Sequence, residues 1–142
     1  MEAAKKTLIL YAEDDHDDFE SVKEALEQLS PDYYLHQAKN GTEVLSYFND
    51  VNAKMPCLIV LDLNMPVMNG KEALMWLKEQ AAYKKIPVMI FTTSSREDDV
   101  KLCQKYGCTF FRKPTLYRDL LHVVQTMMQM CDRNKQSNLT IN

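Results

Sequence analysis

Short runs of apolar residues recur along the chain, separated by segments that are apolar on one helical face. The runs are unbroken rather than alternating, and this pattern predicts strands buried on both faces of a parallel sheet. A fifth run of mixed polarity suits an edge strand. The strongly apolar runs are 7–12, 57–62, 87–92 and 108–111, and the mixed run is 33–38.

The segments between the runs place apolar side chains three or four positions apart, which is typical of helices that cover a sheet. In the first segment, Phe19, Val22 and Leu26 fall on one face and acidic residues on the other. Ser94 and Glu97 have the spacing of a capping box and predict a capped start to the fourth helix. The expected helices are 16–30, 41–50, 71–81, 96–106 and 116–131.

Strand and helix therefore alternate five times, which predicts the α/β class with helices on both faces of a parallel sheet. Five such units favour a flavodoxin-like (βα)5 three-layer sandwich with strand order 2-1-3-4-5. The expected domain covers residues 1–131, and the polar stretch 132–142 is expected to be a frayed C-terminal tail.

Composition agrees with one packed domain. The chain has 142 residues, of which 46% are hydrophobic and 26% charged, so extensive disorder is not expected. A net charge of −3, with both signs interspersed, gives no indication of a nucleic-acid-binding surface. The apolar run near the N-terminus is too short for a signal peptide or a membrane span, so we expect a cytoplasmic protein without membrane insertion.

The four cysteines carry no metal or redox motif. They form no C-x-x-C pair, and no histidine lies at metal-ligand spacing from them. We therefore expect free, small, buried thiols in a reducing compartment. These residues are Cys57, Cys103, Cys108 and Cys131.

Polar residues follow the ends of the four core strands. Glu13 and Asp14 follow the first run, Asp62 ends the second, Thr92 ends the third, and Lys113 follows the last. Ligands of open parallel sheets bind beyond the carboxyl ends of the strands, at the point where the strand order reverses. Each residue alone is ordinary as a cap or turn residue. Together they predict one crevice.

The predicted crevice has the composition of a phosphoryl-transfer site. Clustered carboxylates repel one another, and a divalent cation relieves the repulsion. Oxygen ligands without His or Cys suit Mg²⁺. An ammonium from Lys113 and a hydroxyl from Thr92 would add stabilising charge and a hydrogen-bond donor for a phosphoryl group.

The sequence resembles the receiver domains of two-component response regulators over about residues 6–130. The resemblance rests on "LILYAEDD", "LIVLDLNMPVMNG", "IPVMIFTTSS" and "FFRKP", in this order and in these strand contexts. The phrases "FTTSS" and "AYKKIPV" are similar to stand-alone receivers that partner phytochrome-type and other hybrid sensor kinases.

The resemblance implies a phosphoryl acceptor and its metal site. Asp62 would form an acyl phosphate. Mg²⁺ would be bound directly by Asp14 and Asp62, through a water by Glu13, and by the backbone carbonyl of Asn64. The acids taken as charges of the first helical turn, rather than as ligands, are Asp15, Asp17 and Asp18.

The resemblance also implies a switch. Thr92 would hydrogen-bond the phosphoryl oxygens, and Lys113 would pair with them, with a cis bond to Pro114. Phe110 occupies the position of the family's aromatic switch, so switching would rest on ring packing alone. Phe111 is expected to point to the opposite face of the strand.

The expected function is that of a single-domain receiver, phosphorylated by a histidine kinase or a phosphotransfer protein. It would signal through a downstream protein or through self-association, with helix 4, strand 5 and helix 5 as one surface for a homodimer. It would promote its own phosphorylation and dephosphorylation without being a conventional enzyme.

Three alternatives are weaker. An aspartate-nucleophile phosphohydrolase uses a second acid two residues after the nucleophile, where this chain has Asn64. A flavodoxin-like binding module needs a first loop that cradles phosphate, and "AEDDHDD" would repel one. A degenerate receiver is disfavoured because all the site residues are present.

Overall fold

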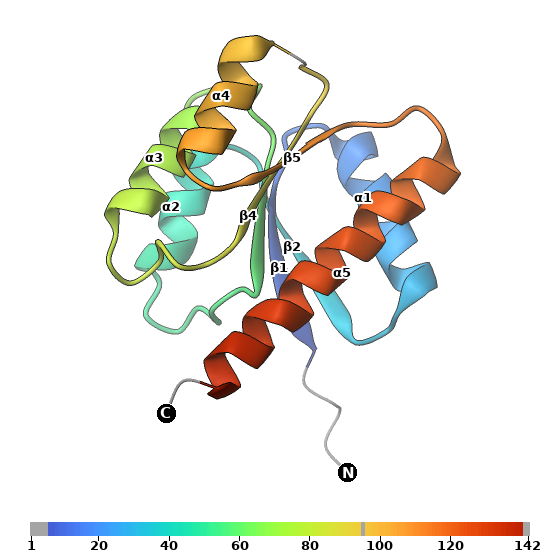
Figure 1. The fold of residues 1–142 in the computed structure, drawn as a ribbon, viewed down its shortest axis with the longest axis horizontal. Coiled ribbons are helices and arrows are strands. Elements are labelled where there is room, and N and C mark those ends of the chain that lie inside the picture. The colour runs from blue at the N-terminus through green and yellow to red at the C-terminus, as the bar shows by residue number, and fades with distance from the viewer. Residues whose placement is uncertain (1–5, 95, 141–142) are drawn as a thin grey trace.

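Five parallel strands form one sheet in the order β2-β1-β3-β4-β5, and five helices alternate with them along the chain (Figure 1). The structure is a computed structural model that describes residues 6–94 and 96–140, with backbone alone for 136–140. The strands are β1 Thr7–Ala12, β2 Tyr33–Ala38, β3 Leu58–Leu61, β4 Val88–Thr92 and β5 Thr109–Arg112. The helices are α1 His16–Leu29, α2 Gly41–Asn49, α3 Gly70–Glu79, α4 Glu97–Lys105 and α5 Tyr117–Thr140.

The sheet is the middle of three layers. Helices α1 and α5 cover one face, and α2, α3 and α4 cover the other (Figure 1). Successive side chains of a strand point to opposite faces, so an unbroken apolar run contributes to both cores. The α1/α5 core receives Ile9, Tyr11, Leu58, Val60, Met89 and Phe91. The opposite core receives Leu10, Ala12, Ile59, Leu61, Val88 and Ile90.

The predicted fold class, strand order and edge strand are therefore confirmed. Burial on both faces is wrong for the run 108–111, because β5 is the other edge strand and only partly buried. The capping prediction is wrong: α4 begins at Glu97, with Arg96 in the N-cap position and no side-chain cap. Ser94 instead donates its hydroxyl to Asp99 Oδ2 at 2.7 Å. The Ser94 oxygen accepts the Arg96 backbone N–H at 3.3 Å, which precedes the helix, rather than an N–H of the first helical turn.

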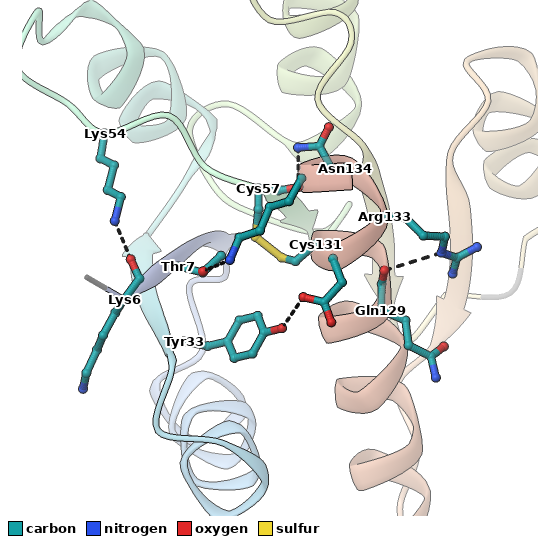
Figure 2. Close-up of a disulfide and its surroundings, with 11 residues drawn as sticks. Lys6, Thr7, Tyr33, Lys54, Cys57, Gln129, Cys131, Arg133 and Asn134 are labelled. Atoms are coloured by element: carbon teal, nitrogen blue, oxygen red, sulfur yellow. Dashed lines mark hydrogen bonds between the residues drawn. A yellow bond between two sulfur atoms is a disulfide. The ribbon is translucent and has the colours of Figure 1, made fainter. Parts of the chain in front are cut away.

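Helix α5 does not end at residue 131. It continues to Thr140, so the expected frayed tail is wrong for residues 132–140, while residues 1–5 of the expected domain and 141–142 of the tail lie outside the described residues. Neither Gly nor Pro interrupts the stretch. The first residues of this stretch also contact neighbouring segments of the chain. Asn134 Nδ2 donates to Cys57 O at 3.2 Å, and Tyr33 Oη donates to Asp132 Oδ1 at 2.7 Å (Figure 2).

Cys57 and Cys131 form a disulfide, so the prediction of four free thiols is wrong for this pair (Figure 2). The bond joins the residue just before β3 to α5, with the two Cα atoms 4.8 Å apart. The two residues are separated by 74 positions, and only the packing of α5 across the sheet brings them together. Cys103 and Cys108 are free, as expected.

Helix α5 is the longest helix and carries an apolar stripe toward the sheet, with charged side chains on its other faces. Within the described part of the chain, no helix combines the length and the apolar character that crossing a bilayer requires.

Candidate functional site

The sheet brings the predicted polar residues to one edge. Glu13 and Asp14 follow β1, Asp62 follows β3, Thr92 ends β4, and Lys113 follows β5. The last residues of β1 and β3 are register partners, as are the last residues of β4 and β5. Parallel neighbours in register end at the same level, so side chains from distant parts of the sequence meet at the carboxyl edge.

Lys113 is the centre of the charge network. Its Nζ lies 2.5 Å from Glu13 Oε1, 2.9 Å from Asp62 Oδ2 and 2.8 Å from Asp18 Oδ2. Burial opposes the charge on this amine, but the three carboxylates outweigh burial and hold the pKa of Lys113 above its ordinary value. One ammonium group thus forms ion pairs with three acidic side chains.

Glu13 is fully buried and is the most perturbed acid of the site. Its Oε1 accepts a hydrogen bond from Tyr11 Oη at 2.9 Å, and its Oε2 accepts one from the Asp15 backbone N–H at 3.2 Å. Burial raises the pKa of Glu13 to about 7; the hydrogen bond from Lys113 lowers it, and the nearby charge of Asp62 raises it. Without a metal ion, burial thus leaves Glu13 only partly ionised near pH 7, although Tyr11, Lys113 and the Asp15 backbone all donate hydrogen bonds to it.

The pKa of Glu13 predicts a pH dependence of stability in metal-chelating buffer. The folded chain holds this proton up to about pH 7, whereas an unfolded chain releases it near 4.5. In this window the folded state binds more protons, so the free energy of unfolding falls as pH rises, by up to about 3 kcal/mol, and levels off above it. Urea denaturation at a series of pH values measures this slope.

Glu13→Gln is the matched control, because it keeps the shape of the side chain and removes the titration. Its unfolding free energy should be flatter between pH 4.5 and 7 than that of the wild type. The lowered pKa of Asp99 makes stability depend on pH only below this window, and the raised pKa of Lys113 does so only above it. A wild-type stability that stays constant or rises through the window would contradict the assignment.

Glu13, Asp14 and Asp62 fit a divalent cation. Each offers one carboxylate oxygen, and the three oxygens lie within 4.8 Å of one another. Opposite ligands of Mg²⁺ are about 4 Å apart, twice the metal–oxygen distance, so a small contraction would suffice. All three donors are hard oxygens, which suits Mg²⁺ or Mn²⁺ and not a soft-ligand metal. Asp14 is exposed, which leaves room for water ligands.

Backbone groups of the loop after β3 fix the position of Asp62. The Asn64 backbone N–H donates to Asp62 Oδ1 at 3.1 Å. Gly70, the first residue of α3, packs so closely that a Cβ there would lie 2.1 Å from the Asp62 carbonyl oxygen, and only glycine permits this approach. Between them, Val67 has a φ of 66°, a strained conformation for a β-branched residue.

Thr92 is fully buried, and its Oγ1 accepts from the Ser94 backbone N–H at 3.3 Å and from Asn64 Nδ2 at 3.4 Å. Phe110 packs with the α2/α3/α4 core, and Phe111 packs with the α1/α5 core, which confirms their opposite directions.

The expected cis bond between Lys113 and Pro114 is wrong, because no peptide bond among the described residues is cis. Trans is the lower-energy form of most X–Pro bonds, and the contacts of the Lys113 side chain form with it here. The Lys113 backbone N–H also donates to Thr92 O at 2.8 Å, which ties the end of β5 to the end of β4.

Sequence reasoning missed three contributors to the site. Asp18 lies in the first turn of α1, as expected, but it also binds Lys113; Asp15 is the N-cap residue of α1 rather than a first-turn charge. Tyr11 donates to Glu13 from within β1, and burial together with that carboxylate raises its pKa. Gln37 Nε2 donates to Glu13 O at 2.9 Å from the edge strand. One signal was available: Asp18 lies in the first turn of α1, directly after the acidic loop that follows β1.

Comparison with known proteins agrees with this geometry. The model of the response regulator receiver domain matches residues 9–125. Response regulator Rcp1 of Synechocystis sp. is 32% identical over 123 residues, which cover 83% of this chain and 84% of that protein.

Two solved structures show the same fold. The phosphorylated cyanobacterial phytochrome response regulator RcpA has a TM-score of 0.79 and 28% identity, covering 86% of this chain and 91% of that one. The Mn²⁺-bound form of Rcp1 has a TM-score of 0.78 and 32% identity, covering 85% and 91%. One relative is thus phosphorylated, and another binds a divalent cation.

Proposed function

Because this chain belongs to the response regulator receiver domain family, we propose that it accepts a phosphoryl group on Asp62. The observation that carries the proposal is the position of this carboxylate. It is 5% exposed, it lies at the end of a core strand, and its Oδ2 is 2.9 Å from Lys113 Nζ. The rigid strand holds the nucleophile at the mouth of the crevice, next to a fixed positive charge.

The reaction needs little from the protein beyond this positioning. An Asp62 oxygen forms a bond to phosphorus, and the bond from phosphorus to the donor's imidazole nitrogen breaks. The imidazole then takes a proton from solvent. Mg²⁺, held by Glu13, Asp14, Asp62 and the Asn64 carbonyl, would supply charge neutralisation for the phosphoryl oxygens. Lys113, whose Nζ lies 2.9 Å from Asp62 Oδ2, supplies a second positive charge.

The same residues would carry the signal after phosphorylation. The Thr92 hydroxyl and the Lys113 ammonium would move to the phosphoryl oxygens. Phe110 lies on the core face that Thr92 would leave, and its ring would repack there. The surface formed by α4, β5 and α5 would change as a result, in the manner of two-state switches.

The phosphoryl donor follows from the family. Receiver domains act with histidine kinases, and we propose a histidine kinase or phosphotransfer protein as the donor. The similarity to Rcp1 and to the phytochrome response regulator RcpA favours a kinase of the phytochrome type. The readout would be a downstream protein or a second copy of the chain on the α4–β5–α5 surface.

Acetyl phosphate tests the proposed chemistry without knowledge of the kinase. With Mg²⁺ present, intact-protein mass spectrometry should show the gain of one phosphoryl group, and hydroxylamine should remove it, because it cleaves acyl phosphates. With EDTA in place of Mg²⁺, the gain should fall to background. A chain that stays unmodified in Mg²⁺ would overturn the proposal.

A further inference from the structure

Asp99 is a buried carboxylate that the proposed phosphorylation chemistry does not use. It lies in the first turn of α4 and is 2% exposed. Its Oδ1 lies 2.8 Å from the Nζ of Lys71, in the first turn of α3, and its Oδ2 accepts the Ser94 hydroxyl at 2.7 Å. A buried charge needs partners that offset its desolvation; here Lys71 offsets the charge by proximity, while Oδ1 accepts no well-aligned hydrogen bond from the described residues. These partners hold the pKa of Asp99 below its ordinary value although burial, the largest influence, raises it.

The second partner connects this carboxylate to the phosphorylation site. Ser94 follows β4 by two residues, and its backbone N–H donates to Thr92 Oγ1 at 3.3 Å. A continuous series of contacts therefore runs from Thr92 through Ser94 and Asp99 to Lys71. It links the proposed switch hydroxyl to the first turns of two helices.

This series of contacts opposes movement of Thr92. Both Asp62 oxygens have partners, Lys113 and the Asn64 backbone N–H, so the observed structure is the state with a free Asp62 carboxylate. A movement of Thr92 toward a phosphoryl group on Asp62 either leaves the Ser94 N–H without its acceptor or draws Ser94 away from Asp99. Each outcome breaks a contact of a buried polar group.

We propose that Ser94, Asp99 and Lys71 form a latch. The latch holds the β4–α4 segment in the conformation seen with unphosphorylated Asp62, and it thereby sets the affinity of the site for a phosphoryl group. The proposal rests on the function proposed above. The latch stabilises one of two states, so weakening it shifts the population toward the other state and tightens binding of ligands that prefer that state. These three are positioning residues, because none of them touches the phosphoryl group.

Beryllofluoride with Mg²⁺, a mimic of the acyl phosphate, is the probe, and its dissociation constant is measured by calorimetry. Ser94→Ala removes the hydroxyl link and leaves the ion pair. Lys71→Gln removes the ion pair and leaves the hydroxyl link. Each variant should bind beryllofluoride roughly threefold to tenfold more tightly than the wild type, the range expected from the loss of one polar contact. The double variant should gain little more, because the contacts act in series.

Lys101→Gln is the matched control. It breaks an exposed ion pair with Glu97 on the same helix, where the two charged atoms are 3.3 Å apart, and it should leave the dissociation constant unchanged. Thermal unfolding of every variant separates the latch from a structural role, since a structural role lowers stability without tightening beryllofluoride binding.

The outcomes distinguish the latch from the function on which it rests. If the wild type binds beryllofluoride and Ser94→Ala binds it equally or more weakly, the latch is overturned and the proposed function stands. If the wild type does not bind it at all, both fail. Ser94 is only partly buried and its substitution is small, so this variant is expected to fold even if Lys71→Gln is not stable.

Discussion

Asp62→Asn is expected to reduce labelling by acetyl phosphate to background while the chain stays folded. The amide keeps the size of the side chain and its Oδ1 still accepts the Asn64 N–H, so the loop after β3 retains its contact. The amide is a very poor nucleophile and carries no charge for a divalent cation. Mass spectrometry after incubation with acetyl phosphate and Mg²⁺ measures the labelling, and circular dichroism measures the fold.

Asp17→Asn is the control for this substitution. It also removes one negative charge near the site, but Asp17 is exposed in the first turn of α1 and belongs neither to the metal cluster nor to the Lys113 network. It should be labelled like the wild type. If Asp62→Asn were labelled at the wild-type level, another residue would be the acceptor, and the position of Asp62 would need a different explanation.

Reduction of the Cys57–Cys131 bond is expected to lower the free energy of unfolding by about 4 kcal/mol. The bond closes a loop whose ends are 74 residues apart, and the chain-entropy estimate for a loop of this length gives that magnitude. Urea denaturation of the oxidised and the reduced wild-type chain measures the difference directly, because both samples contain the same side chains.

Cys57→Ala provides the control for the reductant. Its stability should not respond to dithiothreitol, because the substitution removes the disulfide: Cys131 loses its partner, and Cys103 and Cys108 are free in the wild type. Equal stability of oxidised and reduced wild type would show that the bond contributes nothing to the fold. Hydrogen exchange should also rise in the last turns of α5 on reduction, because the bond holds α5 to the start of β3.

Much of the site was predictable because the topology follows from the apolar runs. Once five parallel strands alternate with helices, the strand order follows from general rules of connection, and the residues after β1, β3, β4 and β5 must meet. Glu13, Asp62, Thr92 and Lys113 were placed in this way. Asp18 was not, because its contact with Lys113 depends on how α1 leaves the β1 loop, and its position in a first helical turn has a sufficient local explanation.

The local signals failed where a distant partner competed for the same group. Ser94 has a capping sequence, but its oxygen accepts the Arg96 N–H before α4 begins, and its hydroxyl donates to Asp99, which also binds Lys71 from another helix. Residues 132–140 are polar enough to suggest a tail, yet contacts with the start of β3 and with β2 accompany a helix that continues to Thr140.

The sequence by itself determined the fold, the strand order and the set of acidic and basic groups at one edge of the sheet. These depend on the period of the apolar pattern and on which residue follows each strand, and both are local properties. Tertiary structure alone decided the disulfide, the three acids shared by Lys113 and the pairing of the buried Asp99 with Lys71. Each of these depends on the distance in space between residues far apart in the chain, which no local pattern contains.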